Sequence, residues 1–290
     1  MLILISDAFA ANLPDKLKKF GQVTDDKNKL SRADVILIRS KTKCTKEYID
    51  SAPNLKLIIR GGVGLDNVDL DYAKSKGIQV YNTPAASSIA VAELAFAMMI
   101  AMPGNLVPAH NSMRQGKWMK KELKRTELFG KKLGVVGCGR IGLEVAKRAQ
   151  AFGMRVYGFD IIEVDSDYIE EQLTLQKLVS ICDYLTLHLP SSEETNGVIN
   201  KELIAQMKDG IYIVNTGRGK LVVEEDVVQA LESGKIAGYA ADVYYQEPPE
   251  GSPLLKAPNV LLAPHLGSSS KENLLRIGDI IEKIVADFKS

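Results

Sequence analysis

Three side chains in the C-terminal part of the sequence have the types needed for acid–base chemistry on a small acid. His265 follows a short apolar run, and Glu247 lies in a loop stiffened by prolines. A carboxylate bonded to a neutral imidazole fixes its tautomer and raises its pKa, which gives an acid or base that works near neutral pH. Arg218 stands between two glycines, a poor position for helix packing and a good one for binding a carboxylate. Alone, each has a structural interpretation as well; as a set, they indicate hydride transfer to or from a 2-hydroxy or 2-oxo acid.

A glycine pattern supplies the second piece of chemistry. Gly137, Gly139 and Gly142 follow the apolar run Leu133–Val136 directly and open a helical pattern. The three glycines permit a tight turn, a close approach of pyrophosphate and close helix–strand packing, and the N–H groups at the helix start hold the phosphates. Asp160 ends the next apolar strand, roughly 20 residues later, where it favours ribose hydroxyls and repels a 2′-phosphate. The pattern predicts NAD rather than NADP; the alternative is a glycine-rich turn that binds nothing.

Length and composition restrict the class of protein. The 290 residues suggest two domains, and a formal net charge of +1 gives no indication of nucleic-acid binding. Cys44, Cys138 and Cys182 are scattered, which favours a reducing compartment and argues against a disulfide framework or a metal site. The longest apolar stretch, Ile89–Met102, contains Glu93 and is short for a membrane span, and no signal peptide is recognised at the start. We therefore expect a cytoplasmic protein with neither membrane nor nucleic-acid partners.

Apolar runs alternate with helical patterns, which predicts parallel sheets covered by helices. The expected strands are Leu2–Ile5, Asp34–Ile38, Leu55–Ile59, Ile78–Tyr81, Leu133–Val136, Arg155–Phe159, Tyr184–Leu189, Ile211–Asn215, Ala237–Asp242 and Val260–Ala263. The expected helices are Leu13–Phe20, Lys46–Asp50, Leu70–Lys76, Ser87–Met102, His110–Met119, Leu173–Ser180, Lys201–Met207, Glu224–Ser233 and Lys271–Phe288. The helix Ser87–Met102 is apolar on nearly all sides, so we expect it between domains or in a subunit interface. The amphipathic helix Lys271–Phe288 either closes the nucleotide domain or returns to the first one.

The later strands deliver polar or glycine-rich residues to one rim, because ligands of open parallel sheets bind beyond the carboxyl ends of the strands. Besides the glycine turn and Asp160, the rim contains His188-Leu189-Pro190, Asn215-Thr216-Gly217-Arg218-Gly219, Asp242 and His265. We interpret His188 as either structural or a contact at the edge of the cofactor.

The sequence resembles the D-isomer-specific 2-hydroxyacid dehydrogenases over nearly its whole length. The similar segments are ILIRSKTKCT (36–45), RGGVGLDNVD (60–69), YNTPAASSIAVAEL (81–94), GKKLGVVGCGRIG (130–142), NTGRG (215–219), ADVYYQEPP (241–249) and APHLGSSS (263–270). The resemblance implies an α/β fold of two Rossmann-like domains, each with a doubly wound parallel sheet. The substrate-binding domain would be discontinuous and flavodoxin-like, residues 1–92 and 273–290, and the NAD-binding domain would be residues 93–272. It also implies a homodimer joined through the helix Ser87–Met102.

The resemblance assigns a role to each candidate residue. His265 would take the proton of the substrate hydroxyl, Glu247 would orient the imidazole, and Arg218 would hold the substrate carboxylate. The implied cofactor contacts are Gly137, Gly139, Arg140, Ile141, Gly142, Asp160, His188, Leu189, Pro190, Thr216, Gly217, Arg218, Asp242, His265 and Gly267. The implied substrate contacts are Arg39, Arg60, Gly62, Val63 and Gly64, together with Arg218 and His265. No metal is expected.

The two arginines that follow early strands bear on the substrate. Arg39 and Arg60 look like the family's phosphate-side arginines, which favours the phosphorylated acid 3-phospho-D-glycerate and a role in serine biosynthesis. The alternative is that both only cap strand ends at a solvated rim. The enzyme would then be a glyoxylate/hydroxypyruvate reductase or a broad D-2-hydroxyacid dehydrogenase; a third possibility is a binding protein like the family's NAD(H)-sensing corepressors. Feedback through an appended serine-binding domain is not expected, because the sequence stops at Ser290.

Overall fold

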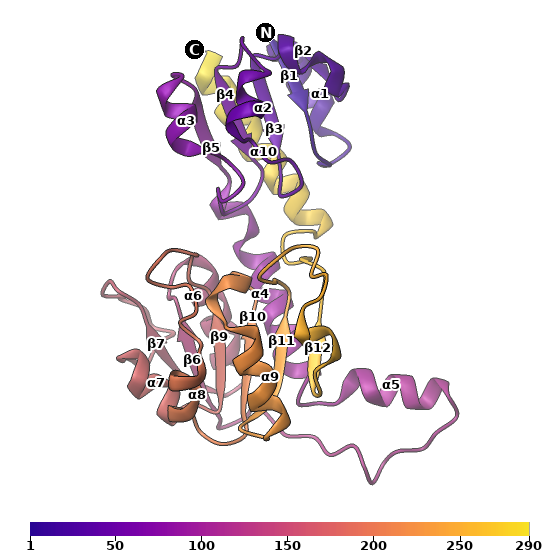
Figure 1. Ribbon diagram of the computed structural model, residues 1–290, viewed down its shortest axis with the longest axis vertical. Coiled ribbons are helices and arrows are strands. Elements are labelled where there is room, and N and C mark those ends of the chain that lie inside the picture. Colours follow the sequence, from indigo (N-terminus) through magenta and orange to yellow (C-terminus); the bar gives the residue numbers. More distant parts are fainter. Residues whose placement is uncertain (290) are drawn as a thin grey trace. The chain divides into compact units, whose positions relative to one another are not determined.

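The computed structural model describes residues 1–289, which fall into two compact units. Unit 1 consists of Met1–Ser88 and Ser268–Ser290, and unit 2 of Ile89–Gly267. Each contains one parallel sheet with helices, so the expected fold class is confirmed (Figure 1). These boundaries lie a few residues before those expected at 92 and 272, and the roles of the units as substrate-binding and NAD-binding domains stay a prediction.

The sheet of unit 1 has five strands in the order β2-β1-β3-β4-β5. The strands are β1 (Leu2–Ile5), β2 (Gln22–Thr24), β3 (Val35–Ile38), β4 (Leu57–Arg60) and β5 (Gln79–Asn82). Its helices are α1 (Leu13–Leu17), α2 (Lys46–Asp50), α3 (Leu70–Ser75) and α10 (Lys271–Lys289), with 3₁₀ turns η1 (Lys18–Phe20) and η2 (Lys27–Arg32). The central strands β1, β3 and β4 are almost wholly buried, which explains their continuous apolar sequences.

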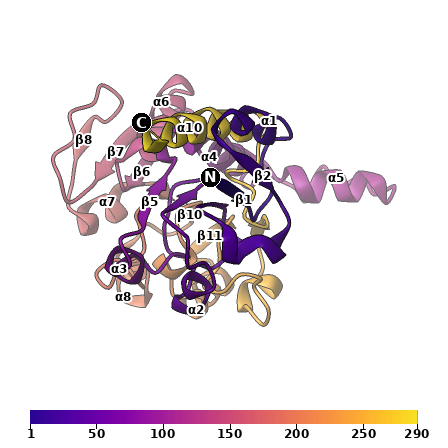
Figure 2. The same ribbon diagram turned by 90° about the horizontal axis from the view of Figure 1, so that it is seen from above.

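The last helix belongs to unit 1 and completes its core. Ile277, Ile281 and Val285 of α10 are fully buried in a cluster with residues of β1, β3, β4 and α1. α10 contacts α1 directly, and the two helices lie side by side in Figure 2. The chain therefore returns to its first unit after forming the second, and the alternative that this helix closes the nucleotide domain is wrong.

The sheet of unit 2 has seven strands in the order β12-β11-β10-β9-β6-β7-β8. The strands are β6 (Lys132–Val136), β7 (Arg155–Phe159), β8 (Glu171–Gln172), β9 (Tyr184–Leu187), β10 (Ile211–Asn215), β11 (Ile236–Ala241) and β12 (Val260–Leu262). The helices α6 (Arg140–Ala151), α7 (Leu175–Ile181), α8 (Lys201–Gln206) and α9 (Glu224–Glu232) connect them, with 3₁₀ turns η3 (Gly219–Leu221) and η4 (Pro253–Lys256). The chain runs outward from β6 to β8 and then returns to β9. The strand order thus reverses between β6 and β9, and such a reversal opens a ligand crevice at the carboxyl ends of these strands.

Two helices precede this sheet, α4 (Pro84–Ala101) and α5 (Leu106–Arg114). By length and composition alone α4 could cross a membrane, but 56% of its apolar window is buried, and the core helix of a soluble protein passes the same test. Its Ala92, Ala95 and Met99 are fully buried in a cluster with residues of β6 and α6. α5 projects away from the sheet of unit 2 in Figure 1.

Candidate active site

The glycine turn of unit 2 follows β6, at the reversal point of the sheet. Gly137 has φ +97°, and a Cβ there would lie 2.8 Å from the carbonyl carbon of His188. A Cβ on Gly142 would lie 2.1 Å from the carbonyl oxygen of Gly137. Gly139, which immediately precedes α6, differs because a Cβ there would meet no non-neighbouring atom within 4 Å. Gly137 and Gly142 are required by the fold. The open space at Gly139 and the first turn of α6 instead fits a phosphate that approaches the backbone.

Asp160 stands directly after β7, beside this turn. Its Oδ2 accepts the N–H of Cys138 at 2.8 Å, and its Oδ1 accepts the N–H of Ile161 at 2.8 Å. Oδ1 also accepts the N–H of Ile162 at 3.4 Å. Oδ2 has a second lone pair, so it can still accept a hydrogen bond from a ribose hydroxyl. Cys138 is buried, and burial raises the pKa of its thiol to about 12, which leaves it a neutral packing residue.

Two buried polar atoms near the carboxyl ends of β9 and β10 have no hydrogen-bond partner within residues 1–289. They are Nδ1 of His188 and Oγ1 of Thr216. The other ring nitrogen of His188 lies 2.8 Å from Oγ1 of Thr186, and burial lowers the pKa of His188 to about 3. The imidazole is therefore neutral at physiological pH. Since unpaired buried polar atoms are costly, both atoms fit contacts to a bound polar cofactor.

The next two residues are Leu189, which is buried, and Pro190, which is exposed. Leu189 is buried in the hydrophobic core of unit 2, so any cofactor contact there is confined to its backbone. The carbonyl of Pro190 accepts the hydroxyl of Thr195 at 2.7 Å.

The predicted acid–base pair is formed in unit 2. Nδ1 of His265 lies 2.6 Å from Oε2 of Glu247, and the two side chains are 34% and 36% exposed. Burial alone would raise the pKa of the Glu247 carboxyl. The hydrogen bond and charge of His265, the N–H of Tyr244 and the charge of Arg218 outweigh it and hold that pKa below its ordinary value. The carboxylate is thus ionised near neutral pH, and it fixes which imidazole nitrogen remains for chemistry.

Asp242 holds the segment that carries the imidazole. Its two carboxylate oxygens accept the N–H groups of Leu266 and Gly267 at 2.7 and 2.8 Å. His265 has φ +54°, a conformation that side-chain-bearing residues adopt only when their surroundings enforce it. Burial raises the pKa of Asp242 although these hydrogen bonds and the charge of His265 oppose that shift. Asp242 therefore acts as an anchor for the loop that contains His265, and its expected contact with the cofactor stays a prediction.

Arg218 follows β10 in a turn that is held tightly. Asn215 donates to the carbonyl of Arg218 at 3.0 Å and accepts the N–H of Gly217 at 3.1 Å. A Cβ on Gly219 would lie 1.8 Å from the carbonyl carbon of Tyr244, so the turn packs directly on the loop that contains Glu247. The guanidinium donates to the carbonyl of Gly217 at 2.8 Å. Arg218 is thus close enough to the pair of Glu247 and His265 for its charge to lower the pKa of Glu247, while the catalytic roles of the three residues stay a prediction.

The other expected substrate residues, Arg39, Arg60 and the loop Gly62–Gly64, lie in unit 1. The Gly62–Gly64 loop follows β4, and it is held by Asn82, whose Nδ2 donates to the carbonyl of Val63 at 2.5 Å. Gly62 has φ +150°, and a Cβ there would lie 1.6 Å from Nη1 of Arg60. The guanidinium of Arg60 therefore lies directly against the loop. Backbone N–H groups and a cation are combined here in the way an anionic ligand requires.

Arg39 is more constrained. Its backbone N–H donates to Asp7 at 2.6 Å, and its Nη2 donates to the carbonyl and hydroxyl of Ser268 at 3.1 and 3.2 Å. Its Nε is buried without a partner within residues 1–289, and burial lowers the pKa of the guanidinium, opposed by Asp7. Part of its hydrogen-bonding capacity is therefore already used within unit 1.

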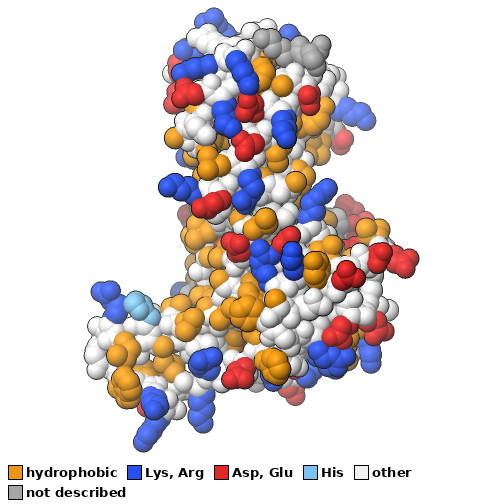
Figure 3. All heavy atoms as spheres, turned by 180° about the vertical axis from the view of Figure 1, so that it is seen from behind, with side chains coloured by type: hydrophobic (Ala, Val, Ile, Leu, Met, Phe, Trp, Pro, Cys, Tyr) orange, Lys and Arg blue, Asp and Glu red, His pale blue; other side chains and the backbone are white. Residues whose placement is uncertain are grey.

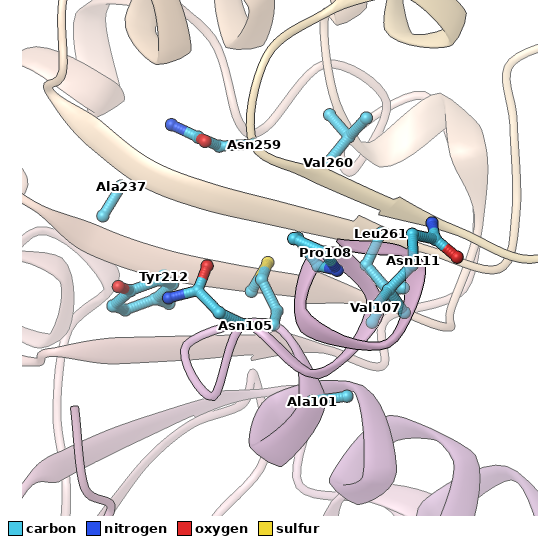
Figure 4. Close-up of a pocket in the computed structure, with 11 residues that line it drawn as sticks. Ala101, Asn105, Val107, Pro108, Asn111, Tyr212, Ala237, Asn259, Val260 and Leu261 are labelled. Atoms are coloured by element: carbon cyan, nitrogen blue, oxygen red, sulfur yellow. The ribbon is translucent and has the colours of Figure 1, made fainter. Parts of the chain in front are cut away.

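A separate cavity of about 550 Å³ lies near the amino ends of β10, β11 and β12, at the base of α5 (Figure 4). Apolar side chains line it together with Asn105, Asn111, Tyr212 and Asn259. Its lining has no acid–base pair, and the pair of Glu247 and His265 lies beyond the carboxyl ends of these strands. In the described part of the chain no group of three or more His, Cys, Asp or Glu side chains is arranged to hold a metal ion.

Comparisons with known proteins agree with this geometry. The sequence profile described as "D-isomer specific 2-hydroxyacid dehydrogenase, NAD binding domain" matches residues 96–267. A hydroxypyruvate reductase of Thermotoga maritima is 45% identical, over 88% of this chain and 85% of the relative. Human D-3-phosphoglycerate dehydrogenase is 40% identical over 96% of this chain, which spans 55% of that longer protein. The solved D-lactate dehydrogenase of Aquifex aeolicus, in complex with NAD and lactic acid, superimposes with a TM-score of 0.87, at 32% identity over 99% of this chain and 95% of that one.

The chain therefore belongs to the D-isomer-specific 2-hydroxyacid dehydrogenase family, as its sequence indicated. It is an NAD-dependent oxidoreductase with a Rossmann-like fold that acts on small hydroxy or oxo acids.

Proposed function

We propose that the protein oxidises 3-phospho-D-glycerate to 3-phosphooxypyruvate with NAD, as a cytoplasmic enzyme of serine biosynthesis. The single observation that carries the reaction class is the His265–Glu247 pair at 2.6 Å, with Arg218 on the neighbouring strand end. Phosphoglycerate dehydrogenases of mammals and archaea are 37 to 42% identical to nearly the whole chain, which supports this substrate.

The chain's own residues manage the proton and the orientation of the substrate. When bound, NAD would supply the acceptor for the hydride that leaves C2, and its reduced form would supply the hydride in the reverse direction. His265 has Nδ1 bonded to Glu247, which leaves Nε2 to accept the hydroxyl proton. The ionised Glu247 stabilises the imidazolium that forms, and Arg218 binds the substrate carboxylate and polarises the oxygen on C2.

On the substrate side, we assign the carboxylate to the N–H groups of the Gly62–Gly64 loop and the phosphate to Arg60, with Arg39 in a supporting role. The guanidinium of Arg60 lies against Gly62, which would place two anion-binding groups next to each other. Arg39 is partly engaged by Ser268, so we expect Arg60 to contribute more to phosphate binding.

A second candidate is a hydroxypyruvate reductase, favoured by the Thermotoga maritima relative, most of whose length the chain covers. Steady-state kinetics on phosphorylated and unphosphorylated acids separate the two. For the phosphoglycerate enzyme, Arg60→Gln should lower kcat/KM for the phosphorylated substrate about 10- to 100-fold, since a hydrogen bond to a charged group contributes about 1.5–3 kcal/mol. Arg155→Gln, at an exposed arginine paired with Glu170, is the matched control. A preference of orders of magnitude for hydroxypyruvate or glyoxylate, with no effect of Arg60→Gln, would establish the second candidate.

We also propose that the chain forms a homodimer through the surface of α4 and α5. Leu106, Val107 and Met113 of α5 and Trp118 beyond it are exposed apolar side chains, and orange apolar patches mark this projecting segment in Figure 3. An exposed apolar surface of this kind indicates an association site. Light scattering on the intact protein and on Met113→Lys tests this, because a monomeric intact protein would contradict it.

A further inference from the structure

The loop that carries Glu247 has neither helix nor strand over residues 242–252. One buried carboxylate joins its two ends. Glu224, the first residue of α9, is 7% exposed. Its Oε1 accepts the backbone N–H of Tyr245 at 3.1 Å, and its Oε2 accepts the hydroxyl of Ser252 at 2.5 Å. Tyr245 and Ser252 stand on either side of Glu247 in the sequence, so a single side chain closes the loop around the catalytic carboxylate.

A second set of contacts ties the same loop to the strand that precedes His265. The hydroxyl of Tyr244 donates to the carbonyl of Ala263 at 2.9 Å, and the N–H of Tyr244 donates to Oε1 of Glu247 at 3.2 Å. Tyr244 directly precedes Tyr245, whose N–H donates to Glu224. The position of Glu247 is thus fixed by the contacts of Tyr244 and by the two hydrogen bonds that Glu224 accepts from Tyr245 and Ser252.

The chemistry of Glu224 suits this role. A carboxylate has two acceptor oxygens, and here each binds a different segment. Its place in the first turn of α9 also lets the positive end of the helix dipole stabilise the negative charge.

We propose that Glu224 is a positioning residue for the acid–base pair. It holds the loop 245–252 so that Glu247 stays within hydrogen-bonding distance of His265, and it acts on the reaction only through Glu247. The proposal rests on the function proposed above, in which Glu247 and His265 transfer the substrate proton. No contact between Glu224 and substrate or NAD is part of it.

Glu224→Ala is the direct test, with Glu225→Ala as the matched control, because Glu225 is the neighbouring glutamate of the same helix turn and is exposed. We expect Glu224→Ala to lower kcat about 10- to 100-fold, the range that follows when a catalytic group moves by about 1 Å. KM for NAD should change less than about 3-fold, since the nucleotide contacts lie elsewhere.

Glu224→Gln still offers an oxygen to Tyr245 and should restore most of the activity. Melting temperatures of all variants identify any failure to fold, and Ser252→Ala, which removes one contact only, then replaces Glu224→Ala.

The double-mutant cycle with Glu247→Gln distinguishes positioning from a general loss of structure. If Glu224 acts through Glu247, Glu224→Ala should reduce kcat by less than about 3-fold in the Glu247→Gln background. An equal loss in both backgrounds, or a parallel rise of KM for NAD, would overturn the proposal. If Glu247→Gln alone left turnover unchanged, the proposed function itself would fail, which is a separate outcome.

Discussion

At the scale of single residues, His265 offers the sharpest test of the chemistry. Replacing it with glutamine keeps a polar side chain of similar size but removes the group that accepts a proton. We expect kcat to fall about 10²- to 10⁴-fold, the usual contribution of a positioned acid–base residue. NAD binding, followed by calorimetry, should persist because the glycine turn and Asp160 are untouched. His110→Gln, at an exposed histidine of α5, is the control. A His265 variant with near-normal turnover would remove this residue from the mechanism.

His188 predicts how stability depends on pH. Its folded pKa is lowered by burial to about 3, while an unfolded histidine titrates at about 6.5. Between these values only the unfolded chain binds the proton, so stability falls as the pH drops, by about 1.4 kcal/mol per pH unit from this group. His188→Gln lacks this dependence. Urea unfolding of both proteins at pH 7 and pH 4.5 gives the difference in their free energies of unfolding. The unmodified protein should lose stability relative to His188→Gln as the pH falls. If this difference stayed constant, the buried imidazole would be protonated in the folded protein.

The residues proposed as catalytic could be selected from the sequence because their neighbours make them conspicuous. Glu247 stands beside prolines, Arg218 between glycines, and His265 after an apolar strand. Glu224 carries no such signal. It is one of three consecutive acidic residues, and only the packing of α9 on the loop decides that Glu224 is buried while Glu225 is exposed. The sequence also gave no indication that both oxygens of Asp242 are used by backbone N–H groups.

At the scale of elements, we expect the glycines of the turn after β6 to have different roles, some in packing and one in ligand binding. A methyl group on Gly142 would lie 2.1 Å from a backbone oxygen, whereas one on Gly139 would enter open space. Gly142→Ala should destabilise the protein by about 1–3 kcal/mol through overpacking and weaken NAD binding as well. Gly139→Ala should melt within a few degrees of the native protein and yet bind NAD more weakly, because the methyl group occupies the phosphate approach. Melting temperature and NAD affinity of both variants check this; equal stability losses would contradict it.

The elements that the sequence did not predict share a physical cause. β2 and β8 have three and two residues, too few for an alternation of apolar and polar residues to be recognised. The helix expected over His110–Met119 is wrong in position: α5 begins at Leu106 after the left-handed Asn105 and ends before Gly116, whose φ is +71°. α4 begins at Pro84 rather than Ser87, because proline suits a first helical turn. Longer strands with strong apolar runs, such as β7 and β10, have the bounds expected from sequence.

At the scale of the whole molecule, the discontinuous unit 1 makes a prediction about cooperativity. α10 returns to fill the core of unit 1, and Ile281 is fully buried there among residues of β1, β3 and β4. Ile281→Ala should cost about 2–5 kcal/mol, the range for removing most of a buried aliphatic side chain. Because each unit has its own hydrophobic clusters, the loss of stability should be confined to unit 1. This should hold although α10 is synthesised after all of unit 2.

Hydrogen exchange measures this directly. In Ile281→Ala the amides of β1, β3 and β4 should exchange faster, while those of β6, β9 and β10 keep their protection and NAD still binds. Ile213→Ala, at a fully buried isoleucine of β10, should produce the reverse pattern. The two substitutions remove the same atoms, so a difference in location cannot come from a difference in size. If either variant accelerates exchange equally in both sheets, the two units unfold as one, and the independence that the separate clusters predict is wrong.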